Sequence, residues 1–81
     1  MSNWDVLGRR VLLTELIELD ISTVRMSFPV GDNNFETIIF DKDFNEQDCW
    51  RYASEAEAIK GHEYAVALAM RLQSDIMAAR S

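Results

Sequence analysis

The sequence is short of the residues that cross-link or interrupt a chain: its 81 residues include one cysteine, one proline and three glycines. A single cysteine, Cys49, excludes an internal disulfide, and this low cysteine usage fits a reducing cytoplasm. No basic start leads into an apolar run, so we expect no secretory signal. No stretch approaches the roughly 18 apolar residues of a membrane span. We therefore expect a cytoplasmic protein that does not associate with membranes.

Motifs for cofactors, metals and catalysis are also missing. The chain has no phosphate-binding loop, no dinucleotide fingerprint and no zinc-ligand spacing. The segment that starts at Asp41 looks like the opening of a calcium loop, but Glu46 stands where glycine is needed and Tyr52 where a bidentate glutamate is needed. Cys49 and His62 would be a nucleophile and a base without a third residue to orient them. We expect no enzyme activity, no cofactor and no metal site, and we interpret Cys49 as a buried thiol.

Positive charge is scarce where negative charge is dense. Residues 32–57 hold eight acidic and two basic residues, and the six acidic and six basic residues elsewhere cancel, so this span carries the whole net charge of −6. Nucleic-acid backbones require clustered Lys and Arg, so we expect no direct nucleic-acid binding. Two interpretations stay open for the span. It is either a solvated, solubilising surface or an acidic face for a basic protein partner, with these candidate residues: Asp41, Asp43, Glu46 and Asp48.

What the chain does contain is enough apolar material for one small domain over residues 1–81, since 48% of it is hydrophobic. Residues 22–28 alternate as a strand that Pro29 is predicted to end. Turn-forming residues follow at 31–34, and residues 35–40 predict a second strand joined to the first by a loop of about five residues. A polar loop over 41–48 and a short strand over 49–52 complete this half.

The first 19 residues allow alternatives. Residues 2–7 fit a short helical turn that Gly8 ends. Residues 9–19 fit a helix by their leucine and glutamate content and a strand by the alternation of Val11, Leu13, Ile17 and Leu19.

The last third of the chain predicts one long helix. Ser54 and Glu57 have the spacing of a capping box. Apolar residues then recur at helical spacing on one side: Ile59, His62, Ala65, Val66, Ala69, Leu72 and Ile76. We expect an α+β fold in which residues 9–52 are mainly β, in a small antiparallel sheet of three or four strands. Helix 54–79 should pack on one face of that sheet.

His62 lies in this apolar stripe. We interpret it as a core residue that donates to a carbonyl or packs on an aromatic ring, with Trp50 or Tyr52 as the expected neighbour; a titrating switch is the alternative. Gly61 costs about 1 kcal/mol relative to alanine inside a helix. It therefore predicts close approach of the helix to the sheet or to an aromatic ring.

Helix length makes a further prediction. About 24 residues span roughly 36 Å, whereas strands of six or seven residues span about 20 Å. The last helical turns should extend past the sheet and expose apolar side chains, among them Met70, Ile76 and Met77. Such surface is expected to form a homodimer or to bind another protein. The alternative is that the segment with Trp4 and Leu7 covers it.

Several short motifs carry a resemblance. They are Ser22-Thr23-Val24-Arg25, Phe35-Glu36-Thr37-Ile38-Ile39-Phe40, Arg51-Tyr52-Ala53-Ser54, Glu57-Ala58 and Gly61-His62. Over about residues 9–66 the chain resembles a group of short uncharacterised proteins of bacteriophages and prophages, notably those of actinobacteria. The resemblance implies a strand for residues 11–16 and brings no assigned activity. Residues 29–34 depart from the pattern, which has a longer Asp-His, Gly-rich loop there.

The expected function is that of a non-enzymatic phage accessory protein that binds another protein. One specific form is an inhibitor of a host defence or nucleic-acid-handling system. The alternative is a structural or assembly component that associates with itself through the helix.

Overall fold

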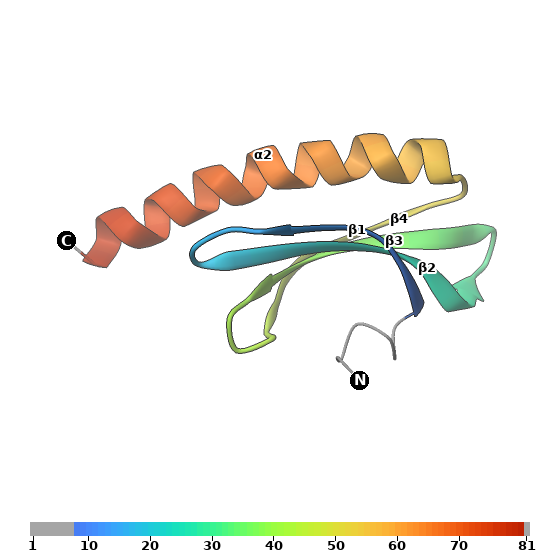
Figure 1. Ribbon diagram of the computed structural model, residues 1–81, viewed down its shortest axis with the longest axis horizontal. Coiled ribbons are helices and arrows are strands. Elements are labelled where there is room, and N and C mark those ends of the chain that lie inside the picture. Colours follow the sequence, from blue (N-terminus) through green and yellow to red (C-terminus); the bar gives the residue numbers. More distant parts are fainter. Residues whose placement is uncertain (1–7, 81) are drawn as a thin grey trace.

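The computed structural model describes residues 8–80, so the helical turn predicted for residues 2–7 lies outside the described residues. Four strands precede one helix: β1 (Gly8–Glu15), β2 (Leu19–Val30), β3 (Asn33–Asp41), β4 (Glu46–Tyr52) and α2 (Glu55–Arg80). Each strand pairs antiparallel with its neighbour in sequence, in the order β1-β2-β3-β4. The helix α2 lies along one face of the sheet (Figure 1). The predicted α+β fold is confirmed.

The ambiguous segment 9–19 belongs to the sheet. It supplies most of β1, the turn at residues 16–18 and the first residue of β2. Tertiary packing decides between the two periodicities, because Leu16 and Leu19 both pack in the core under α2. A bulge at Val11 shifts the register of β1 against β2, which re-aims the side chains around it.

The end of β2 and the turn after it differ from the prediction. The strand continues through Pro29 to Val30, and only Gly31 and Asp32 form the turn. Proline is tolerated there because the β2–β3 ladder is interrupted between Arg25 and Val30, so no partner needs its missing N–H. Gly31 has a φ of 59°, which glycine adopts without strain.

The predicted loop over 41–48 is also shorter than expected. Strand β4 already begins at Glu46, so Glu46, Gln47 and Asp48 are strand residues. Charged residues are poor strand formers, but β4 is an edge strand, where exposed charges are common and block further pairing.

Helix α2 begins where the capping residues predict. The backbone N–H of Glu57 donates to Ser54 Oγ at 3.2 Å, and Ser54 Oγ donates to Glu57 Oε1 at 2.9 Å. The buried side of the helix consists mainly of small residues: Ala58, His62, Ala65 and Ala69. Including Ile59 in the buried stripe was wrong, because its side chain is 41% exposed and Ala58 is buried instead.

The core lies between α2 and the helix-facing side of the sheet. Leu19, Ile21 and Ile39 pack there against the buried alanines of the helix. Short alanine side chains let the helix backbone come close to the sheet. The opposite face is also closed at its centre, since Val24 and Ile38 are buried and point away from the helix by the alternation of their strands.

Gly61 is the position where the Tyr52 side chain packs against the backbone of α2. A Cβ placed on Gly61 would overlap the phenol ring of Tyr52 in β4. The prediction that this glycine allows contact with an aromatic ring is confirmed.

Candidate functional site

The acidic part of the chain is built on the turn between β3 and β4, and Asp41 holds that turn in shape. Asp41 Oδ1 accepts the backbone N–H groups of Asp43 and Asn45, each at 2.9 Å. Its Oδ2 accepts the amide groups of Asn45 at 3.1 Å and Gln47 at 3.4 Å. Two backbone bonds close the turn, from Phe44 N–H to the Asp41 carbonyl and from Asp41 N–H to the Asn45 carbonyl. The loop is therefore fixed by its own hydrogen bonds.

The titration of Asp41 reflects this structural use. Its hydrogen bonds with Asn45, first the backbone one and then the side-chain one, hold the pKa of the Asp41 carboxyl below its ordinary value. A carboxylate with both oxygens occupied in this way has little capacity left for a partner. The structure thus gives Asp41 a local role that differs from that of its acidic neighbours.

The neighbouring carboxylates and one aromatic ring form the surface that we name the acidic tip: Asp43, Phe44, Glu46 and Asp48. All four residues are exposed. The Phe44 side chain is 52% exposed, and its φ of 65° is uncommon for a residue other than glycine, which points to a backbone held by its surroundings. Phe44 follows Asp43 directly in the turn, so the tip combines apolar area with negative charge.

The two basic residues of the span 32–57 form salt bridges with carboxylates outside the acidic tip. Lys42 Nζ lies 2.6 Å from Asp20 Oδ1, and Arg51 Nε lies 2.9 Å from Glu36 Oε2. No salt bridge among residues 8–80 involves Asp43, Glu46 or Asp48. The acidic tip therefore keeps its negative charge uncompensated by the rest of the described chain.

Phe44 was missed by sequence reasoning, which treated residues 41–48 as a polar loop. The available signal was an aromatic residue placed between Asp43 and two further acidic positions. What the sequence did not show was the left-handed backbone conformation of this residue or the exposure of its side chain. The candidate Asp43 lies in the β3–β4 turn and the candidates Glu46 and Asp48 lie in the first residues of β4, while Asp41 holds the turn by its hydrogen bonds.

The candidate residues of the helix separate into two groups. Ile76 packs partly against the core with Leu16 and Leu72. Met70 and Met77 are 55% and 44% exposed, and helical periodicity puts them on the same side of α2 as Ile59. We call these three residues the helix flank. The turn after β1 reaches under the last helical turns, where the Glu18 N–H donates to Gln73 Oε1 at 2.8 Å and Arg80 pairs with Glu18.

The two candidate surfaces lie at the same end of the molecule. Figure 1 shows the β3–β4 turn and the C-terminal end of α2 at one end of the long axis, with the helix above the sheet and the turn below it.

His62 is the centre of a buried hydrogen-bond chain. Its Nδ1 lies 2.7 Å from Thr23 Oγ1, its Nε2 lies 2.9 Å from Thr14 Oγ1, and Thr23 Oγ1 lies 2.5 Å from Thr37 Oγ1. The core role predicted for His62 fits this burial, but its hydrogen bonds go to the hydroxyls of Thr14 and Thr23 and not to a carbonyl. Burial lowers the pKa of His62, and the Glu63 carboxylate opposes that effect.

Cys49 and His62 do not meet. Thr37 and Trp50 are paired residues on the helix-facing side, so Cys49, the neighbour of Trp50, points to the other face. Burial, and then the adjacent Glu36, raises the pKa of the Cys49 thiol to about 12. A thiol in that state is protonated at neutral pH and is a poor nucleophile.

Comparison of the chain with protein-family models, curated proteins and solved structures finds no match. No helix within residues 8–80 has an apolar stretch long enough to cross a membrane. Within the same residues, no group of three or more metal-ligating side chains lies together.

Proposed function

We propose that this chain is a non-enzymatic binding protein whose acidic tip docks on a basic surface of another protein. One observation carries the proposal: a turn fixed by the four side-chain acceptor bonds of Asp41 presents an exposed Phe44 next to Asp43 and close in sequence to Glu46 and Asp48, none of which forms a salt bridge within residues 8–80. Both charge and an apolar anchor are then available at one place.

The energetics favour such a tip. A turn that is already ordered loses little conformational entropy on binding. Aromatic side chains in the centre of an interface contribute a large share of its affinity, and the charged rim steers the encounter. The expected partner therefore has an apolar pocket surrounded by Lys and Arg.

The resemblance to short bacteriophage proteins supports a partner from the host cell. Host proteins that handle nucleic acids carry basic surfaces that match the chemistry of the acidic tip. Inhibition of a host defence or nucleic-acid-handling protein, by occupation of its basic surface, is the specific form that we propose.

Charge reversal tests this proposal. Tagged wild-type protein is used to capture partners from an actinobacterial host lysate, and the variant D43K/E46K is compared with it. We expect capture of a basic protein that falls at least about tenfold with the variant, since each charged pair lost at an interface costs about 1.4 kcal/mol or more. Phe44→Ala should weaken the same capture.

The matched control is E63K/D75K, which makes the same charge change on the exposed side of α2. If D43K/E46K captures the partner as well as the wild type does, or if the control loses it equally, the acidic tip is not the binding surface.

A second candidate function is self-association as a structural or assembly component. The helix flank favours it, because three exposed apolar residues on one side of α2 form a surface of the kind that pairs helices.

Light scattering separates the two functions. Self-association predicts a dimer mass for the wild type and a monomer mass for M70K/M77K, because lysines on the flank would have to lose their hydration in a dimer. A wild type that stays monomeric at high concentration rules out the helix-mediated assembly and leaves the acidic tip as the proposed surface.

A further inference from the structure

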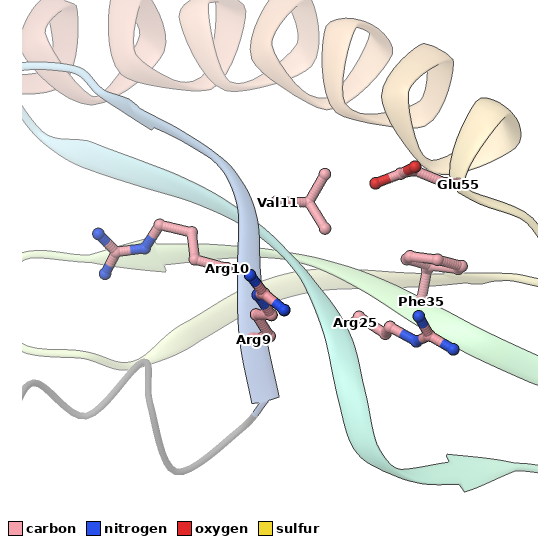
Figure 2. Close-up of a pocket in the computed structure, with 6 residues that line it drawn as sticks. All are labelled: Arg9, Arg10, Val11, Arg25, Phe35 and Glu55. Atoms are coloured by element: carbon pink, nitrogen blue, oxygen red, sulfur yellow. The ribbon is translucent and has the colours of Figure 1, made fainter.

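A basic cleft lies at the other end of β3 from the acidic tip. It has a volume of about 330 Å³ and opens between the sheet and the first turn of α2. Figure 2 shows its lining: Arg9, Arg10, Val11, Arg25, Phe35 and Glu55. This volume is at the lower end of the range for small-molecule sites. Three of the eight Lys and Arg residues of this acidic chain therefore line one cleft.

Two of the arginines are directly opposed. Arg9 of β1 and Arg25 of β2 are cross-strand partners in the antiparallel ladder. Like charges in this position repel each other and destabilise the pair of strands. None of the salt bridges within residues 8–80 involves either of them. No carboxylate of the described chain is therefore paired directly with either guanidinium.

The cleft also has an apolar wall. The guanidinium of Arg25 lies 6.0 Å from the centroid of the Phe35 ring, which fixes the direction of this cation. Figure 2 shows Val11 pointing toward the helix across from Phe35, so the two apolar side chains flank the space between sheet and helix. The β1 bulge at Val11 produces this arrangement.

Glu55 closes the cleft from the helix side. Figure 2 shows its carboxylate extending from the first turn of α2 toward Val11, while the Arg10 side chain points away from the other arginines. The cleft therefore has a positive end at Arg9 and Arg25, a negative end at Glu55, and the apolar side chains of Val11 and Phe35 between them.

From this geometry we propose that the cleft binds a small organic anion. Its phosphate or carboxylate group lies between Arg9 and Arg25, where planar guanidinium groups bind such oxygens with paired hydrogen bonds. Its flat apolar body packs against Phe35 and Val11, and a hydroxyl or amine at its far end donates to Glu55. The bound anion removes the repulsion between the two arginines, which adds to its affinity.

NMR titration of the full-length protein with three probes tests the proposal. Phenyl phosphate offers a phosphate and a flat body, benzoate offers a carboxylate and a flat body, and inorganic phosphate offers charge alone. We expect saturable shifts in the amide signals of Val11, Arg25 and Phe35 with at least one aromatic probe. Inorganic phosphate should bind at least about tenfold more weakly, because it has no body to bury against the apolar wall.

Variants connect the shifts to the arginines. Arg9→Gln and Arg25→Gln should each weaken the binding about tenfold, as expected for the loss of one charge-assisted hydrogen bond. The matched control is Arg71→Gln, which removes the same charge from the exposed side of α2 and should leave the affinity unchanged. Both strand arginines are exposed, so the variants are expected to keep the fold, which their own amide spectra verify.

The outcomes decide the proposal and the chemistry of the ligand. Binding of phenyl phosphate alone identifies a phosphate, and binding of both aromatic probes extends the site to carboxylates. The proposal is overturned if no probe gives saturable shifts, if inorganic phosphate binds as tightly as phenyl phosphate, or if the arginine variants bind as the wild type does.

Discussion

At the scale of single residues, His62 shows what composition and periodicity can and cannot predict. Its position in an apolar stripe correctly predicted burial, since helical spacing alone places it on the sheet-facing side. Its hydrogen-bond partners could not be predicted. Thr14 and Thr23 bond the ring and Thr37 bonds Thr23; the three come from three strands and meet only through the register of the sheet. The role of Gly61 was easier to predict. A glycine inside a helix that follows an aromatic strand already indicates close contact between the helix backbone and an aromatic ring.

The buried histidine makes the fold sensitive to mild acid. Because burial lowers the pKa of His62 in the folded protein, the unfolded chain takes up a proton first, as the pH falls toward 6.5, the ordinary pKa of a histidine side chain. The free energy of unfolding should be highest above pH 6.5 and should fall as the pH drops through 6.5 toward the lower folded pKa. Urea unfolding at pH 7.5 and 5.5 measures this difference.

His62 is the only histidine in the chain, so its ring protons report the titration directly. An NMR midpoint at or above 6.5 would contradict the predicted sign. The variant His62→Gln should show a smaller difference between the two pH values, while Thr23→Val should cost about 1–3 kcal/mol because it leaves the histidine nitrogen without its partner.

At the scale of elements, the helix was the most predictable part and the turns were the least. A capping box, acidic first-turn residues and an apolar stripe all predict α2, and its observed start agrees with them. The turns depend on single backbone conformations. The positive φ of Gly31 shortens one turn, and that of Phe44, together with the hydrogen bonds to Asp41, shortens another. Such effects override the propensities of the residues around them.

The cap of α2 gives a prediction at this scale. Ser54→Ala should lower the free energy of unfolding by about 1 kcal/mol, because the N–H of Glu57 then loses its acceptor at the helix start. Ser74→Ala is the control, since Ser74 is exposed in the middle of the same helix, where alanine is the better helix former. Thermal unfolding of both variants measures the contrast. Equal destabilisation by the two substitutions would mean that Ser54 does not act as a cap.

At the scale of the whole molecule, the fold redistributes a charge imbalance that the sequence already shows. Residues 32–57 carry the net negative charge. Lys42 and Arg51 pair with Asp20 and Glu36, so Asp43, Glu46 and Asp48 at the β3–β4 turn and the start of β4 are left without a salt bridge within residues 8–80. The arginines of the first two strands gather at the other end. The sequence could not predict this polarity, since it arises from antiparallel pairing that aligns Arg9 with Arg25. The two proposed sites therefore lie far apart and can be altered separately.

The order of the strands has a consequence for how the chain folds. Every strand pairs with its neighbour in sequence, so the sheet needs no long loop closure and its hairpins can form quickly. The core, in contrast, needs α2, which is synthesised after all four strands. On the ribosome the nascent sheet must therefore wait with Leu19, Ile21 and Ile39 uncovered until the helix emerges, and this interval is when the chain is most open to aggregation.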